Sequence, residues 1–213
     1  VSNGYVTNLI VAQALAENFS HVLIDEKAHP SLADAAQFFN CPILKFKHRD
    51  AEDLARAILR IGKNTKLILL TDGMFSHDGS IAPLKSYAKI LPRHSVLLVD
   101  DAHGAGTTGK TGKGTIELEA IPRKQVIQSI TLSKAFGVYG GAILCSDELR
   151  AKILTRSRMF GGSTPLPLPL ANAALASVGI LRSEKGLRRR LVENVNYVQA
   201  CLEKAGVEIA ATP

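Results

Sequence analysis

Short runs of apolar residues alternate with amphipathic segments along the first two thirds of the chain. The runs have the length of buried strands and lie at residues 21–25, 43–46, 66–71, 96–100, 125–131 and 141–145. Between them, the spacing of apolar positions predicts helices at 9–17, 31–39, 51–61 and 84–91. From residue 147 onward the pattern is predominantly helical, apart from the Pro-rich stretch GGSTPLPLPLA at 161–171, which we expect to be a loop at an interface.

The predicted strands lack the alternation of apolar and polar positions that is typical of a sheet with one solvated face. Such strands, separated by helices, indicate an α/β fold with a mostly parallel central sheet and helices on both faces. Ligands of these sheets bind beyond the carboxyl ends of the strands. A site is therefore expected around Asp25, Thr71, Asp100 and Thr131 and the loops that follow them.

Composition narrows the class of protein. The 213 residues, 46% of them hydrophobic, can bury a core, and no run of about 18 apolar residues predicts a membrane span. The net charge is +7, but the basic residues are scattered except for Arg188-Arg189-Arg190, which we interpret as a solvated helix face. Three unpatterned cysteines suit a reducing compartment. We expect a cytoplasmic protein with no metal and with neither nucleic acid nor membrane as a partner.

A glycine-rich loop follows the run that ends at Asp100. Residues 104–109 read GAGTTG, which matches the G-x-G-x-x-G pattern of dinucleotide-binding loops. In that pattern the first glycine follows the strand at once and a helix begins within the motif. Here Asp100-Asp101-Ala102-His103 intervenes, and no apolar helical pattern starts after the loop. Nucleotide binding is therefore the weaker interpretation.

A lysine and an aspartate at neighbouring strand ends point to other chemistry. Lys134 lies between the run QVIQSIT and the segment FGVYGG, where desolvation would lower its pKa and make its amine a nucleophile toward aldehydes. Taken singly, Lys134 reads as a surface residue and Asp100 as a loop cap. Together they are the two poles of a pyridoxal 5′-phosphate (PLP) site: an amine for the aldehyde and a carboxylate for the ring nitrogen. His29 offers a ring for stacking, and Asn3-Gly4-Tyr5 precedes a helix whose N-terminus can bind phosphate.

At this point the chain resembles a known family. The segments NGYVTN, DEKAHPSL, TDGMFSHDGSIAPL, VDDAHGAGTTGKTGKGT, TLSKAFGVYGG and GGSTPLPLP are similar, in the same order, to those of the α-oxoamine synthases. That family belongs to the fold-type I PLP-dependent enzymes. The resemblance spans nearly the whole chain and implies the three-layer large domain of a fold-type I transferase.

The resemblance implies a catalytic set of four residues. Lys134 would bind the cofactor's aldehyde and later move protons at the substrate's α-carbon, and Asp100 would pair with the ring nitrogen. His103 would hydrogen-bond the phenolic oxygen of the ring, and His29 would stack on it.

Further residues are implied to bind the cofactor. Ser76 would lie near the phenolic oxygen, and Thr131 with the backbone of Gly4 and Tyr5 would hold the phosphate. Thr164 would reach the phosphate of a neighbouring subunit, which implies a homodimer. The glycine-rich loop would cross near the dimer interface and the cofactor, where its glycines would provide tight backbone turns.

The implied reaction is that of a PLP-dependent acyltransferase, which condenses an amino acid with an acyl-CoA to give an aminoketone, CoA and CO2. Three departures from the family pattern leave the substrates open: His48-Arg49-Asp50 replaces His-Asn-Asp, Asn3 replaces a serine, and Pro30 replaces a small residue.

The family pattern also implies two domains. Residues 1–185 would form the PLP-binding large domain, and residues 186–213 a helix and the start of a C-terminal small domain. We expect the family's N-terminal arm and most of the small domain, with its carboxylate-binding arginine, to lie outside this chain. The chain alone would then be a cofactor-binding core and not a competent enzyme.

Two rival functions share these residues. A PLP-dependent aminotransferase of fold type I would use the same lysine and aspartate, but aminotransferases related to aspartate aminotransferase commonly place a tyrosine where this chain has His103. A non-catalytic binding protein that kept the fold is disfavoured, because Lys134, Asp100 and both histidines are present.

Overall fold

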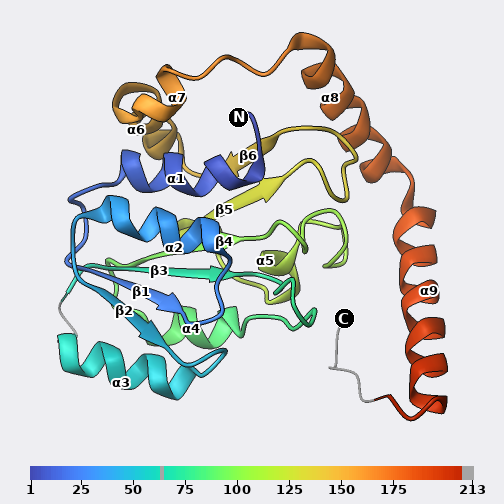
Figure 1. Ribbon diagram of the computed structural model, residues 1–213, viewed down its shortest axis with the longest axis horizontal. Coiled ribbons are helices and arrows are strands. Elements are labelled where there is room, and N and C mark those ends of the chain that lie inside the picture. Colours follow the sequence, from blue (N-terminus) through green and yellow to red (C-terminus); the bar gives the residue numbers. More distant parts are fainter. Residues whose placement is uncertain (63–64, 208–213) are drawn as a thin grey trace.

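The computed structural model describes residues 1–62 and 65–207, and its strands form a six-stranded sheet in the order β2-β1-β3-β4-β5-β6 (Figure 1). The strands are β1 His21–Asp25, β2 Ile43–Phe46, β3 Leu67–Asp72, β4 Val96–Asp100, β5 Val126–Thr131 and β6 Gly141–Leu144. Neighbouring strands from β2 to β5 are parallel, whereas β6 is antiparallel to β5. The predicted α/β class with a mostly parallel sheet is confirmed.

The helices and 3-10 turns connect the strands and then continue beyond them. They are α1 Gly4–Ala14, α2 Pro30–Ala36, η1 Gln37–Phe39, α3 Ala51–Ile61, α4 Leu84–Ile90, α5 Thr115–Leu118, η2 Arg123–Gln125, α6 Asp147–Arg156, α7 Arg158–Gly161, α8 Leu168–Ser183 and α9 Lys185–Lys204. The last four residues of the predicted Pro-rich loop, 168–171, form the first turn of α8. Proline is tolerated in the first helical positions because its missing N–H needs no partner there.

Helix α1 begins five residues before the predicted start. Asn3 caps it, because its side-chain oxygen accepts a hydrogen bond from the backbone N–H of Val6 at 3.0 Å. The helix ends at Ala14, and Glu17 has a positive φ of 67° that a helix does not allow. The cap places the free N–H groups of the first turn at the carboxyl edge of the sheet.

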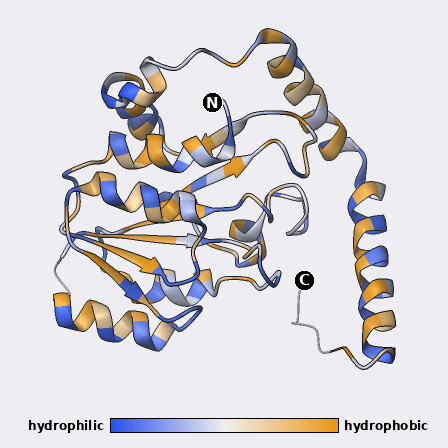
Figure 2. Cartoon of the chain, in the orientation of Figure 1, coloured by the Kyte–Doolittle hydropathy of each residue, from blue (hydrophilic) through white to orange (hydrophobic). Residues whose placement is uncertain are grey.

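Two apolar layers enclose the sheet. Side chains of α1, α2 and α6 pack on one face, where they meet Ile68 and Leu70, and side chains of α3 and α4 pack on the other, where they meet Leu67 and Leu69. Because successive residues of a strand point to opposite faces, both faces of β3 are buried. Figure 2 shows the strands coloured mainly as hydrophobic.

Helices α8 and α9 lie along one side of the molecule, next to the loops that follow β4 and β5 (Figure 1), and contain no buried residue. The expected boundary near residue 185 coincides with the junction of these helices, but the division into two domains stays a prediction. Residues 208–213, the end of the expected second domain, lie outside the described residues. No helix in the described part of the chain is long and apolar enough to cross a membrane.

Candidate active site

A pocket of about 320 Å³ lies at the carboxyl ends of β3, β4 and β5, beside the first turns of α1 and α2. It contains all of the predicted site residues except Ser76 and Thr164. The residues that line it are Asn3, Gly4, Tyr5, His29, Ser31, Asp72, Asp100, Ala102, His103, Thr131, Ser133 and Lys134. The fold thus brings residues from five segments that are distant in the sequence to one edge of the sheet.

Asp100 is the last residue of β4 and is only 6% exposed. Its Oδ2 accepts a hydrogen bond from Asn8 Nδ2 at 2.6 Å and a longer one from Ser31 Oγ at 3.4 Å, and its Oδ1 accepts from Ala102 N at 3.2 Å. A buried carboxylate requires such partners because it has lost its water. These bonds fix the carboxylate in one orientation.

Asn8 is a positioning residue that the sequence did not reveal. It is fully buried, and its Oδ1 accepts a hydrogen bond from Ser129 Oγ at 2.6 Å, which orients the amide so that Nδ2 faces Asp100. Asn8 lies one helical turn after Gly4 on α1, so both residues face the same side. The spacing of four residues between Gly4 and Asn8 in NGYVTN is the feature of the sequence from which Asn8 could have been predicted to face the pocket.

His29 lies directly before α2 and is held in place by Ser31 and Asp72. Its Nδ1 accepts a hydrogen bond from Ser31 N at 3.2 Å and lies 2.8 Å from Ser31 Oγ. Its backbone N–H donates to Asp72 Oδ2 at 2.8 Å. The imidazole lies edge-on to the ring of Tyr5, with ring centroids 6.1 Å apart. These contacts hold the His29 ring at the wall of the pocket.

Asp72 is a second buried carboxylate in the pocket and was not among the predicted site residues. It is paired with Asp100 in the register of β3 and β4. Burial, and then the negative charge of Asp100, raise the pKa of Asp72 to about 7, although the hydrogen bond from His29 N opposes this. The carboxyl of Asp72 therefore holds its proton to a higher pH than an exposed aspartate does.

The raised pKa of Asp72 makes folding stability depend on pH. The folded chain keeps a proton on this carboxyl that the unfolded chain releases near its ordinary pKa of 3.8. The resulting stabilisation is present below that value and is lost as the pH rises through about 7. We expect Asp72→Asn, which cannot ionise, to gain stability relative to the wild type between about pH 5 and about pH 7, by up to about 1.4 kcal/mol per pH unit. Urea unfolding of the PLP-free chain at several pH values measures this.

The exposed substitution Glu203→Gln serves as the control for the Asp72 experiment. Its free energy of unfolding is expected to follow the wild type at every pH. A pH-independent difference between Asp72→Asn and the wild type would contradict the raised pKa.

The N-terminus of α1 closes one side of the pocket against β5. A Cβ atom on Gly4 would lie 2.6 Å from Thr131 Cβ, so only glycine allows this approach of helix and strand. Thr131 ends β5, is 8% exposed, and accepts a hydrogen bond at Oγ1 from Ser133 N at 3.3 Å. Free N–H groups of a helix and a neighbouring hydroxyl form an anion-binding site.

Lys134 and His103 complete the pocket. Lys134 is exposed in the single chain, so the expected desolvation of its amine is not found there. The pKa of His103 is lowered, first by burial and then by the positive charge of Lys134, while Asp100 opposes the shift. His103 is therefore a neutral imidazole at pH 7.

Ser76 and Thr164 lie outside the set of pocket-lining residues. Ser76 is exposed in the turn after β3. Thr164 is exposed in the segment between α7 and α8, which crosses the top of the view in Figure 1. The predicted role of Thr164 concerns a second subunit, and both roles stay predictions.

The glycine-rich loop has a structural explanation in Asp101, which is fully buried. The Asp101 carboxylate accepts hydrogen bonds from Thr115 N, Thr115 Oγ1 and Gln128 Nε2 at 2.9, 2.8 and 2.6 Å. A Cβ atom on Gly104 or Gly114 would lie 2.2 or 1.9 Å from its oxygens. Burial raises the pKa of Asp101 to about 6, although these hydrogen bonds oppose the shift. The loop folds around a carboxylate, which leaves no reason to assign it to a dinucleotide.

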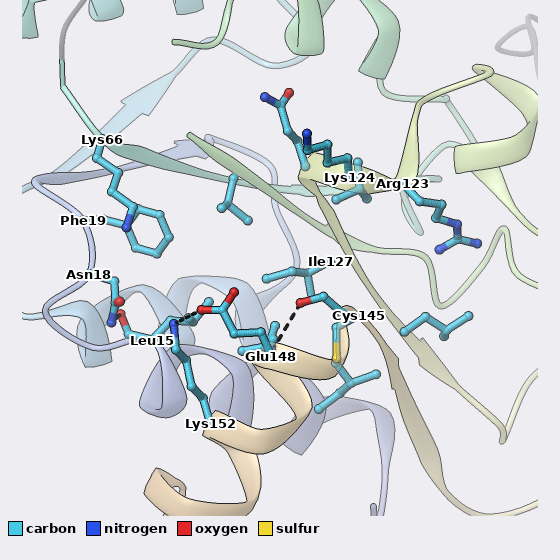
Figure 3. Close-up of a pocket in the computed structure, with 17 residues that line it drawn as sticks. Leu15, Asn18, Phe19, Lys66, Arg123, Lys124, Ile127, Cys145, Glu148 and Lys152 are labelled. Atoms are coloured by element: carbon cyan, nitrogen blue, oxygen red, sulfur yellow. Dashed lines mark hydrogen bonds and ion pairs between the residues drawn. The ribbon is translucent and has the colours of Figure 1, made fainter. Parts of the chain in front are cut away.

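A larger cavity of about 830 Å³ lies at the opposite, amino end of the strands (Figure 3). Its rim carries Lys66, Arg123, Lys124 and Lys152, of which Lys152 pairs with Glu148 at 2.7 Å. Sheets of this kind bind their ligands at the carboxyl ends of the strands. We therefore assign the active site to the smaller pocket.

The comparisons with known proteins identify the family of this chain. A family model described as aminotransferase class I and II matches residues 1–213, and the chain belongs to this family. Among its relatives are two 8-amino-7-oxononanoate synthases: that of Thioalkalivibrio sulfidiphilus is 38% identical over 210 residues, and that of Trichlorobacter lovleyi is 33% identical over 211. Each alignment covers 98% of this chain and 54% of the relative. The chain thus spans about half the length of the curated relatives it matches.

Solved structures of related enzymes share the fold of this chain. The 8-amino-7-oxononanoate synthase of Francisella tularensis has a TM-score of 0.87 and 27% identity, over 100% of this chain and 62% of that one. A serine palmitoyltransferase from S. paucimobilis, solved with a bound PLP–myriocin aldimine, has a TM-score of 0.88 and 29% identity, over 96% and 52% of the two chains. These relatives are α-oxoamine synthases, so the resemblance found in the sequence is confirmed.

Proposed function

We propose that this chain is the cofactor-binding core of a PLP-dependent acyltransferase that condenses an amino acid with an acyl-CoA to an aminoketone, with release of CoA and CO2. The observation that supports this most directly is the gathering of Asp100, His103, Lys134 and the N-terminus of α1 in one pocket. The names of the relatives support the acyltransferase reaction.

The residues of the pocket fit PLP group by group. The amine of Lys134 would bind the aldehyde, and the Asp100 carboxylate would pair with the ring nitrogen. The first turn of α1, with Gly4 and Thr131, would bind the phosphate, because Gly4 permits the close approach of helix and strand. His29 would lie against the ring. When bound, PLP supplies an electron-accepting ring that stabilises negative charge at the substrate's α-carbon.

Each protein group then has a defined task. Asp100, oriented by Asn8, would keep a proton on the ring nitrogen. Lys134, once its amine is free, would take the proton from the α-carbon, a step suited to a base placed beside the reacting atom. The lowered pKa of His103 leaves it neutral, so it would donate a hydrogen bond without adding a positive charge to the pocket.

The assembly and location of the protein are also proposals. We propose a homodimer in which Thr164 reaches the partner's site, since Thr164 is exposed in this chain. The free cysteines Cys41, Cys145 and Cys201 support a reducing, cytoplasmic location.

The reaction is tested with a PLP-loaded enzyme that joins this core to the expected N-terminal arm and small domain, because the core alone is not expected to be competent. This enzyme is offered a panel of amino acids, serine among them, with either acyl-CoAs or keto acids. We expect release of CoA thiol and an aminoketone only in the acyl-CoA mixtures, because His103 occupies the position of the aminotransferase tyrosine. Thiol titration and mass spectrometry measure the products. Formation of a new amino acid from a keto acid, without CoA release, would instead establish the alternative, an aminotransferase.

A further inference from the structure

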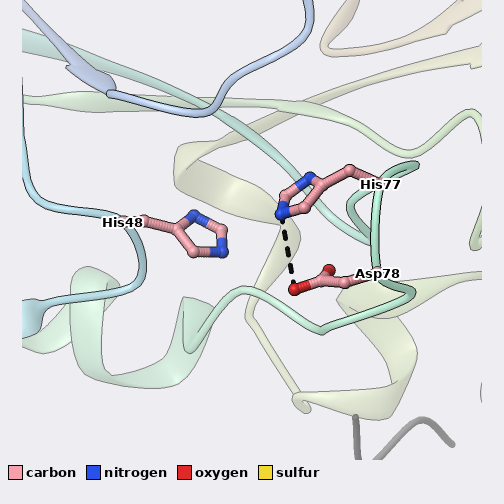
Figure 4. A group of neighbouring side chains, drawn as sticks. All are labelled: His48, His77 and Asp78. Carbon is pink, nitrogen blue, oxygen red and sulfur yellow. Dashed lines mark ion pairs between the residues drawn. The ribbon is translucent and has the colours of Figure 1, made fainter. Parts of the chain in front are cut away.

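A second group of titratable side chains lies outside the pocket, between the turn that follows β2 and the loop that follows β3. His48 comes from the first of these, and His77 and Asp78 come from the second (Figure 4). One nitrogen or oxygen ligand atom from each side chain lies within 4.8 Å of the others. Across residues 1–62 and 65–207, this is the one group of His, Cys, Asp or Glu side chains with such spacing.

A buried carboxylate, that of Asp25, fixes the orientation of the His48 ring through a hydrogen bond to Nδ1. His48 Nδ1 donates to Asp25 Oδ1 at 2.9 Å, and Asp25, which is 1% exposed, also accepts from Lys27 N and Arg49 N. A carboxylate that accepts from Nδ1–H holds the imidazole in the tautomer whose Nε2 carries a lone pair. Histidines that bind metal ions are oriented by second-layer carboxylates in this way.

The Nε2 lone pair of His48 is left without a partner. Nε2 is one of three buried side-chain polar atoms in the described residues that lack a hydrogen bond, together with Ser80 Oγ and Tyr87 Oη. Phe75 packs edge-on against the His48 ring, with centroids 4.4 Å apart, and the His77 ring lies at 5.3 Å. Figure 4 shows His48 directed toward the other two side chains. Because a buried unpaired polar atom is costly, this arrangement points to a ligand.

We propose that His48, His77 and Asp78 bind one divalent transition-metal ion of the Zn²⁺ type, at a site separate from the cofactor pocket. Zn²⁺ binds histidine nitrogen and carboxylate oxygen at about 2.0–2.2 Å, so ligand atoms at tetrahedral angles lie roughly 3.3 Å apart. His77 Nε2 and Asp78 Oδ2 are 3.3 Å apart. Rotation of their side chains, which are 39% and 32% exposed, would bring both onto an ion held by His48.

The charges of the nearby carboxylates and the exposure of the site are both compatible with a bound divalent cation. Asp25 and Asp78 together carry the two negative charges that balance a dication, while the two imidazoles bind as neutral ligands. The half-exposed side of the site lets the ion enter and leaves room for water as a further ligand. Mg²⁺ and Ca²⁺ prefer all-oxygen sites and are poor candidates. The bound ion would join the turn after β2 to the loop after β3.

The test is a Zn²⁺ titration of the full chain, prepared without a histidine tag and freed of metal by a chelator, in competition with a coloured chelator. We expect one Zn²⁺ per chain, no competition by Mg²⁺, and a rise in Tm on binding. His77→Gln and Asp78→Asn, both at exposed positions, should each weaken Zn²⁺ binding at least about tenfold, the lower limit for disturbing a metal site. Co²⁺ in place of Zn²⁺ should give a visible absorption band that His77→Gln alters.

The matched control is His94→Gln, which removes another exposed histidine and should leave Zn²⁺ affinity unchanged. The proposal is overturned if no saturable binding occurs, or if His77→Gln and Asp78→Asn bind Zn²⁺ as the wild type does. It is also overturned if His94→Gln loses as much affinity as they do. PLP binding, followed by cofactor absorbance, should be the same in all three variants, which keeps this test independent of the proposed enzymatic function.

Discussion

Lys134→Ala is expected to abolish covalent capture of PLP by the chain. In the wild type, borohydride reduction should convert the link between Lys134 and the PLP aldehyde into a stable secondary amine, found by mass spectrometry on the peptide that contains residue 134. Lys134 is the one lysine among the residues that line the pocket, so no neighbour can replace it. Because Lys134 is exposed, its substitution should leave the Tm of the cofactor-free chain unchanged.

The exposed Lys110→Ala is the control for Lys134, because it removes a lysine from the nearby glycine-rich loop. It should retain covalent capture of PLP in full. If reduced PLP appears on a different lysine of the wild type, the assignment of Lys134 is wrong.

Asp100→Asn is expected to keep the covalent capture of PLP but to lose most of the exchange of the substrate's α-proton. The amide can still accept a hydrogen bond from Asn8 at the position of Oδ2, so the fold and the capture of PLP by Lys134 should persist. The carboxylate charge that keeps the ring nitrogen protonated is lost. In an enzyme that joins this core to the expected arm and small domain, we expect exchange of the α-proton of an added amino acid with solvent to fall at least about 100-fold relative to the wild type. This is the scale found when one electrostatic contact to developing charge is removed.

Loss of the α-proton signal by NMR in D2O measures this exchange. Asp72→Asn removes the neighbouring carboxylate but leaves Asp100 in place, and it should retain most of the exchange. Wild-type exchange in Asp100→Asn would exclude Asp100 as the partner of the ring nitrogen.

The strands could be predicted from the sequence to within one residue at each end, because buried parallel strands are continuous apolar runs. Helix α1 was predicted to start too late. Its first turns carry Thr7 and Asn8, which are buried and polar, so hydrophobic spacing does not reveal them. Helix α5 spans four residues, which is too short for a periodic pattern.

The site was predictable where a residue ends a strand, as Asp100 and Thr131 do. Asp72 was missed because the apolar run was expected to end at Thr71, one residue before the end of β3. Asn8 and Ser129 were missed because their contact joins residues 121 positions apart, and the orientation of an amide against a hydroxyl is decided only by packing. The exposure of Lys134 depends on the path of a loop, which no periodicity describes.

The space that Asp101 occupies also limits which residues the relatives of this chain can carry at nearby positions. Gly73 lies in another segment, yet a Cβ there would stand 2.6 Å from the same Asp101 carboxylate that crowds Gly104 and Gly114. The three glycines and the aspartate are therefore linked by sterics: while Asp101 is kept, a side chain at any of the three glycine positions would clash with it. Thr115 crowds two of these glycines as well: a Cβ on Gly73 would lie 2.2 Å from its Oγ1, and a Cβ on Gly104 would lie 2.8 Å from its Cγ2. A relative with a side chain at either position must therefore differ at Thr115 as well as at Asp101. Aligned relatives should therefore keep glycine at positions 73 and 104 wherever both Asp101 and Thr115 are kept, because together these two side chains fill the space that a Cβ would need.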